Sequence, residues 1–402
     1  MLSGKSVVLG VTGSIAAYKI ANLASMLKKL NADVTVLMTE NATNFINPIT
    51  FETLTGNKCL IDTFDRNFQF NVEHVSLAKK ADVVMIAPAS ANVIGKLANG
   101  IADDMLTTTV MACECKKIIS PAMNTRMYKN PIVQDNMQKL SRFGYEVISA
   151  DSGYLACGDE GIGKMPSENV LLQYILRECA CKKDMVGKKV LVTAGPTMEK
   201  IDPVRFISNH STGKMGYAIA RNCMLRGAEV TLVAGKTNLE PPMFVNVINV
   251  VSAKDMYNAV IKNFEQQDIV IKAAAVADYR PINPADEKVK KQDGELSIQL
   301  ERTEDILKKL GEIKTKQFLC GFSMETENLV ENSRKKLKKK QLDMIVANNL
   351  KNEGAGFGTD TNIVTIITPD DIKEFEIMSK DRVAENIVDQ ILSRLQTNTK
   401  TE

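Results

Sequence analysis

Apolar, β-branched runs alternate along the first half of the chain with segments whose apolar residues recur every three or four positions. The first run is Ser6–Gly10 (SVVLG), and the apolar positions between Ile15 and Leu30 then follow helical spacing. Further strand-like runs are separated by helical stretches; they are Asp33–Met38, Asp82–Ala87, Lys117–Ser120 and Glu146–Ser149. Strands this apolar, with helices between them, predict a parallel sheet that is covered by helices on both faces.

The pattern begins again after a charged stretch, KKDMVGKK, that contains a glycine. KVLVTAGPT then repeats the order found at the start of the chain: a basic residue, an apolar strand and a glycine turn. A helical stretch and further strand-like runs follow; they are Met215–Arg226, Glu229–Gly235, Val245–Val250, Asp268–Val276, Gln317–Phe322 and Asp343–Asn348. Between Asn362 and Met378, two alternating runs flank a Pro-Asp turn, which predicts a β-hairpin.

These patterns predict an α/β protein with two doubly wound parallel-sheet domains, residues 1–187 and 188–402. The hairpin is expected in the second domain. The length of 402 residues agrees with two domains, since one domain usually holds ~100–200 residues. Hydrophobic residues make up 44% and charged residues 25%, which is ordinary for globular proteins and argues against disorder.

Charge and cysteine content argue against several classes of function. The net charge is +3, from 51 basic and 48 acidic residues, so nothing favours binding to nucleic acid. No run approaches the ~20 apolar residues of a membrane span, and the N-terminus lacks the apolar core of a signal peptide. Eight cysteines without a CxxC pair or zinc-finger spacing favour reduced thiols. We therefore expect a cytoplasmic protein that neither spans a membrane nor binds nucleic acid.

Small, polar loops follow four strands of the first domain: GVTGS, MTEN, APASAN and SPAMN. In doubly wound sheets, ligands bind where strands end and helices begin, so four such loops predict one shared ligand. The turn at Gly13 and Ser14 suits a phosphate, because backbone N–H groups can approach it at the positive end of a helix. Its GxxG spacing is neither GxGxxG nor a Walker A motif, which argues against NAD binding and P-loop chemistry. A simple strand-to-helix turn is the alternative interpretation.

Histidine is scarce, and imidazole is the side chain that most readily exchanges protons near neutral pH. The two histidines are His74, just ahead of a helical stretch, and His210, in NHSTG. A structural or solvent-facing role is the alternative for His74, and a loop hydrogen bond for His210. Cys157 lies in the glycine-rich segment GYLACGDEGIGKM rather than in an apolar run, which favours a loop that closes over a site.

Four motifs, GVTGSIAAYK, APASAN, SPAMNTRMY and ACGDEGIGKM, resemble the flavin-dependent cysteine decarboxylase family, in particular its phosphopantothenoylcysteine decarboxylases. The resemblance covers nearly all of residues 4–180 and implies a flavodoxin-like flavoprotein domain. It further implies that FMN is bound at the sheet edge by Gly13, Ser14, Thr39 and Ser90. In this family the flavin oxidises the substrate thiol to a thioaldehyde, which gives the neighbouring carboxylate an electron sink.

The same resemblance assigns three catalytic roles. His74 is the base that accepts the thiol proton, Asn124 binds the substrate carboxylate, and Cys157 protonates the enethiol intermediate. Lys164 stands where arginine is common in the family, and lysine lacks the planar fork with which arginine holds a phosphate. The contact between this segment and a substrate phosphate therefore stays open.

In the second domain, NHSTG (residues 209–213) precedes the first long helix and suits both its cap and an anion. STGKMG is not a P-loop, because no glycine stands five positions before Gly213 and Met215 replaces the hydroxyl residue that holds magnesium. AAAVADY predicts a strand that ends in Asp278, and EKVKK places Lys288 in a loop. RKKLKKK holds six cations in seven residues, and a solvated helix face is the alternative to a binding role.

This half resembles the phosphopantothenate–cysteine ligase family across Lys188–Leu395, through ISNHSTGKMG, AAVADY and EKVKK. The resemblance implies a Rossmann-like ligase domain in which CTP, with Mg²⁺, activates the carboxylate of 4′-phosphopantothenate as an acyl-cytidylate. Cysteine then displaces CMP, and Asn209 holds the acyl-cytidylate for that step. The resemblance assigns CTP binding to Asp278, Lys288, Asp305, Phe322, Lys336 and Lys340, and converging lysines suit the charge of a triphosphate.

The two families are commonly fused in this order in bacteria, so the sequence predicts a bifunctional enzyme of coenzyme A biosynthesis. Its second domain joins 4′-phosphopantothenate to cysteine, and its first decarboxylates the product to 4′-phosphopantetheine. The resemblance also implies a homo-oligomer with decarboxylase trimers and ligase dimers, and it identifies no metal ligands. Thr303-Glu304 stands where the ligases usually have Asn-Pro, which leaves the turn before Asp305 open. Two alternatives remain: an NAD-linked dehydrogenase, and a flavin-binding regulatory protein without catalysis.

Overall fold

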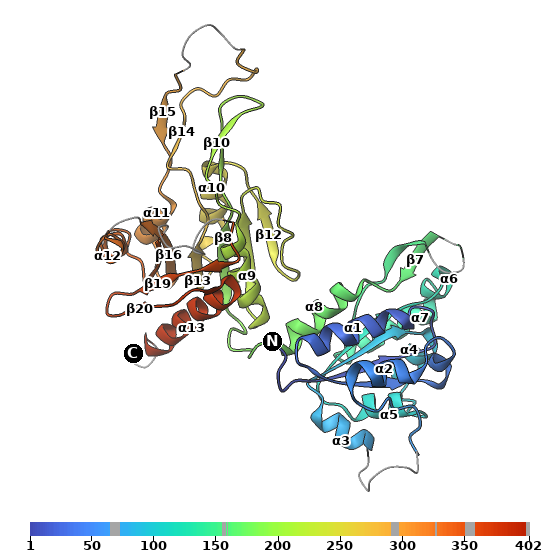
Figure 1. Cartoon of the computed structure of the whole chain (residues 1–402). Helices are drawn as coiled ribbons and strands as arrows, with labels where there is room; N and C mark the ends of the chain where they lie inside the picture. Colours follow the sequence, from blue (N-terminus) through green and yellow to red (C-terminus); the bar gives the residue numbers. More distant parts are fainter. Residues whose placement is uncertain are drawn as a thin grey trace. The chain divides into compact units, whose positions relative to one another are not determined.

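The computed structural model describes residues 1–64, 73–154, 158, 160–290, 297–325, 328–349 and 358–398. The chain forms two compact units, Met1–Lys182 and Lys183–Glu402, each built around its own sheet (Figure 1). The predicted catalytic residue Cys157 lies outside the described residues. Among the helices described, none combines the length and the apolar character that crossing a bilayer requires.

Five parallel strands form the main sheet of the first unit, in the order β2-β1-β3-β4-β5. This is the flavodoxin-like order, so the predicted doubly wound sheet is confirmed. The elements of the unit are β1 (Ser6–Val11), α1 (Ala17–Lys29), β2 (Asp33–Met38), the short 3₁₀ helix η1 (Glu40–Asn44), α2 (Pro48–Thr55), α3 (Glu73–Lys80), β3 (Val83–Ala89), α4 (Ala91–Ala98), α5 (Met105–Ala112), β4 (Lys116–Pro121), α6 (Thr125–Tyr128), α7 (Pro131–Arg142), β5 (Glu146–Val147), β6 (Asp151–Tyr154), β7 (Glu160–Lys164) and α8 (Glu168–Cys179).

Apolar side chains hold this sheet between two layers of helices. On one face, strand residues such as Val8 and Ile86 pack against α3, α4, α5 and α7. On the other face lie α1 and α8, and α1 buries Ile20, Leu23 and Leu27, as their spacing predicts. Burying one such side chain contributes about 1.5–3 kcal/mol. Because burial fixes both faces, the polar loops are left to the edges of the sheet.

The β6–β7 hairpin lies against the loop that carries Asn124. Met123 N donates a hydrogen bond to Gly163 O at 3.0 Å. Gly163 has a φ of +137°, and a Cβ atom at this position would come within 2.2 Å of Met123 O. Any residue with a side chain would therefore prevent this close approach. Part of the glycine content of the GYLACGDEGIGKM segment is thus a requirement of packing.

Eight strands form the main sheet of the second unit, in the order β12-β11-β8-β13-β16-β17-β19-β20. The first six run parallel in the Rossmann order, and β19 and β20 add the predicted antiparallel hairpin at one edge. The elements of the unit are β8 (Lys189–Ala194), β9 (Met198–Lys200), β10 (Phe206–Ser208), α9 (Lys214–Leu225), β11 (Glu229–Ala234), β12 (Asn246–Asn249), α10 (Ala253–Phe264), β13 (Ile269–Lys272), β14 (Tyr279–Pro281), β15 (Leu300–Arg302), α11 (Ile306–Ile313), β16 (Phe318–Glu325), α12 (Leu329–Lys339), β17 (Met344–Asn349), β18 (Thr361–Asn362), β19 (Val364–Ile367), β20 (Ile372–Glu374), β21 (Met378–Ser379) and α13 (Lys380–Asn398).

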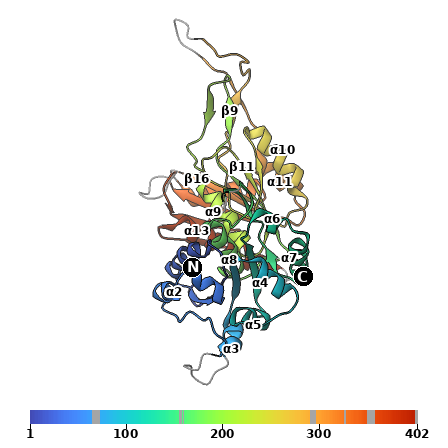
Figure 2. The ribbon, with the colours of Figure 1, turned by 90° about the vertical axis from the view of Figure 1, so that its right-hand side faces the viewer.

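Helices cover both faces of this sheet as well. The face that carries Val270 and Leu319 packs against α10, α11 and α12. Helix α9 lies against β8 and β11 and packs along α13. Figure 2 shows α10 and α11 together on one side of the strands and α13 on the other. The second unit is therefore doubly wound, like the first.

The strand predicted over Asp268–Val276 is wrong at its carboxyl end, because β13 stops at Lys272. Beyond Lys272 the chain leaves β16 and follows the loop after β8, where Ala275 N donates to Gly195 O at 3.0 Å. The alanines of AAAVADY have side chains small enough to lie beside this backbone. The segment is therefore a loop at the carboxyl edge of the sheet.

Two antiparallel ribbons, β9–β10 and β14–β15, project from the carboxyl edge of the second sheet (Figure 1). Each follows a strand of the sheet directly: β9 follows β8, and β14 follows β13. Large apolar side chains are exposed on and beside these ribbons; they are Val204, Phe206, Tyr279, Ile282 and Leu300. Exposed apolar side chains that gather in this way are typical of a surface that another protein chain covers.

Residues 183–187 pack with the second unit through Arg226, which follows α9. The Arg226 guanidinium donates to both carboxylate oxygens of Asp184, at 2.8 and 2.6 Å, and to Asp389 of α13 at 2.6 Å. Met185 N donates to Arg226 O at 3.0 Å. For this reason the units of the structure divide after Lys182, a few residues before the boundary expected at Lys188.

Replacing Arg226 with leucine should loosen the contact between α9 and α13. The Arg226 side chain is 11% exposed, so water replaces its charged hydrogen bonds poorly and the loss should cost about 2 kcal/mol. We expect amide hydrogen exchange in α9 and α13 of the full chain to become about thirtyfold faster, as measured by mass spectrometry. In the control, Arg382→Leu, a 64% exposed side chain loses its pair with Glu385. Equal effects of the two substitutions would contradict this account.

Candidate functional site

The carboxyl ends of four strands in the first unit meet at one edge of the sheet. Val11 pairs with Met38, and Gly10 pairs with Ile86, so the loops after β1, β2 and β3 leave the sheet together. The loop after β4 joins them, because β4 pairs in parallel with β3 up to its last residue. The prediction that GVTGS, MTEN, APASAN and SPAMN share one edge is therefore confirmed.

Thr12 fastens the first and third of these loops together. Its side chain is fully buried, donates to Pro88 O at 2.7 Å and accepts from Ser90 N at 2.9 Å. The hydroxyl therefore has both a donor and an acceptor partner, which is what a structural role requires. Sequence reasoning missed Thr12, and its only signal is a polar residue at the end of an apolar run.

The predicted FMN-binding residues lie on these loops. A Cβ at Gly13 would come within 2.9 Å of Asn41 Cβ, so the turn has room for glycine alone. Ser14 Oγ accepts from Ala16 N, and Ser90 Oγ caps α4 by accepting from Val93 N, both at 3.4 Å. The first turn of α1 holds no acidic residue, so nothing opposes an anion at its positive end.

Thr39 differs from its neighbours because its hydroxyl is buried without a hydrogen-bond partner among the described residues. Thr39 precedes η1 but makes no side-chain cap to it. Leaving a buried hydroxyl unpaired costs about 1–3 kcal/mol, so native proteins rarely do so without a reason. A ligand at this edge of the sheet would supply the missing partner.

A cavity of about 510 Å³ joins the turn before α1 to the loop after β4 and to the β6–β7 hairpin. Its lining includes Ser14, Asn124, Tyr154 and Lys164. Asn124 also caps α6, since its Oδ1 accepts from Arg126 N at 2.8 Å. The structure thus brings a predicted flavin-binding residue and a predicted substrate-binding residue to one cavity, together with the lysine that replaces the family's arginine.

The other two predicted catalytic residues are placed differently. His74 is half-buried and is the second residue of α3, not a loop residue ahead of that helix. Helix α3 packs against α5, and the described lining of the cavity does not include His74. The role of Cys157 stays a prediction, because this residue lies outside the described residues. Tyr154, the last residue of β6, and Lys164, the last residue of β7, line the cavity.

In the second unit, Asn209 and the loop after β13 meet at the carboxyl edge of the sheet. Asn209 Nδ2 donates to Ala275 O at 3.0 Å, and the neighbouring Ser208 Oγ donates to Thr197 O at 2.8 Å. Asn209 is exposed, so its amide is accessible to a substrate. His210 is also exposed, and its side chain does not form the loop hydrogen bond of the alternative interpretation with any described residue.

An ion pair joins two of the predicted CTP-binding residues. Lys340 Nζ lies 2.8 Å from Asp305 Oδ2, and Asp305 caps α11 by accepting from Lys308 N at 3.1 Å. Burial tends to raise the pKa of Asp305, but these two hydrogen bonds outweigh it and hold the pKa below its usual value. Asp305 is therefore a carboxylate at neutral pH.

Lys272, at the end of β13, belongs to the same cluster and was missed by sequence reasoning. Loss of hydration on burial, together with repulsion from Lys340, lowers the pKa of Lys272 to about 8. The carboxylates of Asp305 and Asp278 oppose this shift, which shows that Asp278 faces the cluster as well. The signal in the sequence is a single charged residue at the end of the apolar run IVIK.

Lys336 lies one helical turn before Lys340, as expected for a helical RKKLKKK segment, since Lys340 N donates to Lys336 O at 3.0 Å. The two ammonium groups nevertheless reach different partners. Lys336 Nζ donates to Ser323 Oγ at 3.3 Å, beside the half-buried Phe322 of β16. These contacts bring the predicted CTP-binding residue Lys336 to β16, the strand that also carries Phe322, and leave Lys340 paired with Asp305.

The loop that carries Lys288 belongs to a different hydrogen-bond network. The backbone of its neighbour Val289 donates to Asp202 Oδ2 at 3.3 Å and accepts from Arg205 Nη2 at 3.1 Å. Five hydrogen bonds, from Arg205, Val204 and Val289, hold the pKa of Asp202 well below its usual value. The described contacts therefore fix the Lys288 loop to the β9–β10 ribbon, and the Lys288 side chain is exposed.

Thr303-Glu304, the departure from the ligase motif, forms a turn before α11 that is held by hydrogen bonds of Thr303. Thr303 N donates to Asp278 O at 3.0 Å, and Thr303 Oγ1 donates to Ala277 O at 2.6 Å. Glu304 Oε2 lies 3.9 Å from Nη1 of Arg280 on β14. The following Asp305 still caps α11. A threonine hydroxyl thus fastens this turn to the loop after β13.

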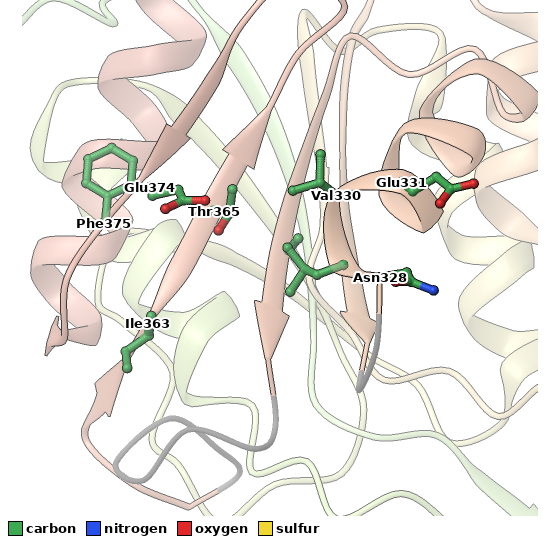
Figure 3. A pocket seen from close by; sticks show the side chains of 9 residues that line it. Asn328, Val330, Glu331, Ile363, Thr365, Glu374 and Phe375 are labelled. Carbon is green, nitrogen blue, oxygen red and sulfur yellow. The ribbon is translucent and has the colours of Figure 1, made fainter.

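A second cavity, of about 550 Å³, lies between the start of α12 and the strands β17, β19 and β20 (Figure 3). Its lining residues are Asn328, Leu329, Val330, Glu331, Ala347, Ile363, Thr365, Glu374 and Phe375. None of these is a predicted CTP-binding residue. Within the described ranges, no three His, Cys, Asp or Glu side chains lie close enough together to hold a metal ion.

Two family models match the chain. The model described as Flavoprotein matches residues 1–180, and the model described as DNA/pantothenate metabolism flavoprotein C-terminal domain matches residues 185–395. A crystal structure of the C-terminal domain of a coenzyme A biosynthesis bifunctional protein CoaBC is 47% identical, with a TM-score of 0.47; the match covers 54% of this chain and 100% of that chain.

Curated relatives match across both units. The coenzyme A biosynthesis bifunctional protein CoaBC of Bacillus subtilis (strain 168) is 47% identical over 395 residues, which cover 97% of either chain. The protein of the same name from Haemophilus influenzae is 41% identical over 396 residues, 98% of this chain and 99% of that one. Because this similarity extends through almost the whole length of both units, the chain belongs to the family of bifunctional coenzyme A biosynthesis proteins.

Proposed function

We propose that this chain is a bifunctional enzyme that catalyses two consecutive steps of coenzyme A biosynthesis. The first is CTP-dependent ligation of 4′-phosphopantothenate to cysteine, and the second is FMN-dependent decarboxylation of the product to 4′-phosphopantetheine. The observation that carries the proposal is the cavity that joins the Gly13–Ser14 turn to Asn124, in the unit that matches the flavoprotein family. The relatives that share both units are named as bifunctional proteins of coenzyme A biosynthesis, which supports two activities in one chain.

The first unit fits a bound FMN. Gly13 and Ser14 would hold its phosphate at the amino end of α1, and Thr39 and Ser90 lie on the flanking loops. The unpaired Thr39 hydroxyl and the space at Gly13 that no side chain fits support this assignment. Bound FMN supplies the two-electron oxidation that allows the carboxylate beside the substrate thiol to leave as carbon dioxide.

Side chains of the first unit bind the substrate and move its protons. Asn124 binds the substrate carboxylate, His74 accepts the thiol proton, and Cys157 protonates the enethiol that remains after carbon dioxide leaves. Lys164 presents a point charge to the same cavity, where it suits a phosphate oxygen of the substrate. Since His74 is not among the described residues lining the cavity of its own chain, a trimer in which another copy supplies His74 fits this arrangement.

The second unit activates 4′-phosphopantothenate with CTP. Lys336 and Lys340 neutralise the phosphates of the nucleotide, whose Mg²⁺ counter-ion accompanies it as part of the substrate. Phe322 lies on β16 next to Ser323, the contact of Lys336, and its ring would offer an apolar surface to the nucleotide. Asn209, anchored to Ala275 O, holds the acyl-cytidylate while the cysteine amine attacks and CMP leaves. The exposed apolar side chains of the β9–β10 and β14–β15 ribbons support a ligase dimer.

Replacing Thr39 with valine should weaken FMN binding without destabilising the protein. Valine keeps the shape of threonine and removes a buried hydroxyl that has no partner in the described structure. The dissociation constant for FMN, measured by titrating the apoprotein, should rise about tenfold, while the free energy of unfolding stays equal or increases. The control Ser6→Ala removes a similar unpaired hydroxyl at the amino end of β1 and should leave FMN affinity unchanged. Unchanged affinity in Thr39→Val would refute the Thr39 assignment.

Cys157→Ser should stop the decarboxylase after carbon dioxide is lost. A serine hydroxyl is a much weaker acid than a thiol, so the enethiol is not protonated. We expect carbon dioxide release from phosphopantothenoylcysteine without formation of 4′-phosphopantetheine. The visible flavin spectrum should equal that of the parent protein before substrate is added, and the two electrons taken from the substrate should then stay on the flavin. A colourless parent protein that FMN fails to reconstitute would contradict the whole first-unit proposal.

Asn209→Asp should spare activation and block amide formation. Asn209 Nδ2 donates to Ala275 O at 3.0 Å, and an aspartate carboxylate has no hydrogen to donate and is repelled by that carbonyl. Pyrophosphate release from CTP and 4′-phosphopantothenate should persist, while formation of phosphopantothenoylcysteine falls about 10²–10³-fold.

The control for this variant is Asn258→Asp, at an exposed position of α10, which should change neither step. In the parent protein, pyrophosphate release should require CTP and 4′-phosphopantothenate before cysteine is added. If ATP supports the reaction and CTP does not, the nucleotide assignment is wrong.

A further inference from the structure

Lys272 ends the central strand of the second sheet and is the charged residue of an otherwise apolar run. Strand β13 lies between β8 and β16, and Lys272 pairs there with Thr193 and Gly321, neither of which carries a charge. Val270, two residues earlier, packs into the core beneath α10, α11 and α12. Because side chains alternate along a strand, Lys272 leaves the sheet on this same face.

Three charged groups from three different segments face the Lys272 ammonium. Asp278 comes from the loop after β13, Asp305 from the start of α11, and Lys340 from the end of α12. Lys340 is already engaged, since its Nζ lies 2.8 Å from Asp305 Oδ2. Each of these three residues is assigned to CTP binding by the family resemblance of the second domain. The cluster with Lys272 holds two charges of each sign.

Lys272 is a half-buried residue whose ammonium has no partner among the described residues. It makes no hydrogen bond and no ion pair with any residue that the structure describes. Partial burial removes water from its three N–H donors without supplying acceptors, which destabilises the charged form and accounts for a pKa of about 8. Lys272 is thus a partly buried lysine without an ion-pair partner in the described structure, and it lies at the carboxyl edge of a Rossmann-type sheet, where such folds bind their ligands.

We propose that Lys272 is a further phosphate-binding residue of the ligase unit, whose ammonium donates to the nucleotide phosphates beside Asp278, Asp305 and Lys340. The inference rests on the proposed function, which gives CTP as the nucleotide substrate of this unit. Lysine suits this role as a compact point charge on a flexible stem. Without Lys272 the cluster has an excess of carboxylate, which repels a triphosphate. With Lys272 protonated, the cluster is balanced before the nucleotide arrives.

The test is calorimetric titration of the full chain with CTP and magnesium chloride. Lys272→Met should raise the dissociation constant about tenfold at pH 7.5, because one charge-assisted contact to phosphate is lost. Lys272→Arg keeps a cation and should stay within about threefold of the parent. The matched control is Lys316→Met, which removes a 67% exposed lysine 4.0 Å from Asp268, and it should bind CTP as the parent does.

A second measurement needs no substitution. In the free protein Lys272 loses its proton above about pH 8, whereas a bound phosphate favours the ammonium form. CTP binding above pH 8 therefore takes up a proton, and the dissociation constant should rise with pH by about tenfold in total, the same factor that Lys272→Met costs. The terminal phosphate is fully ionised over this range and adds no slope of its own. Lys272→Arg should remove the pH dependence, since arginine stays protonated.

The outcomes separate this inference from the function on which it rests. A parent protein that does not bind CTP overturns both. A parent protein that binds CTP, with Lys272→Met binding equally well and no pH dependence between pH 8 and 9.5, overturns only the role of Lys272. If Lys272→Met fails to fold, Lys272→Gln replaces it, and the pH dependence of the parent still decides.

Discussion

Burial of apolar parallel strands on both faces is the constraint on which the rest of this protein depends. Strands such as β1 and β8 are covered above and below by helices, so their buried side chains are almost all apolar, with Ser6 in β1 and Thr193 in β8 as the exceptions. Crossover helices bring the carboxyl ends of all parallel strands to the same edge. In both units the polar loops gather at that edge, with Ser14 and Asn124 in the first and Asn209 and Asp305 in the second.

The polar groups that do enter these edges fall into two energetic classes. Thr12 is buried and fully paired, so it stabilises the junction of two loops and has nothing left to offer a ligand. Thr39 and Lys272 are the opposite case, because each presents a donor that no described residue satisfies. An unpaired buried group costs about 1–3 kcal/mol, and a ligand that supplies the partner recovers this free energy on binding. Thr39 and Lys272 combine an unsatisfied donor with a position at the carboxyl edge of a sheet, and this combination supports their assignment to a ligand.

In the second unit, the lysines of the RKKLKKK segment have different partners according to their positions on α12. The RKKLKKK segment is a run of cations, yet Lys336 and Lys340 reach Ser323 and Asp305, respectively, while Lys335 pairs with Glu331 on the surface of the same helix. The helical period decides which lysines turn toward the sheet. Position also decides the role of Thr303, whose hydroxyl donates to Ala277 O and joins the turn before α11 to the loop after β13.

The two-sheet architecture could be predicted from local patterns, because a strand buried on both faces is a nearly uninterrupted apolar run and such runs are visible in the sequence. The sequence also located Ser14, Asn124 and Asn209, whose motifs depend on short spacings. That most of AAAVADY is a loop could be seen only in the folded chain, because small apolar residues suit a strand and a packed loop equally. The loop forms here because Ala275 N donates a hydrogen bond to Gly195 O in the loop after β8. The tertiary structure likewise decided the role of Lys272, because that role depends on charges contributed by segments far away along the chain.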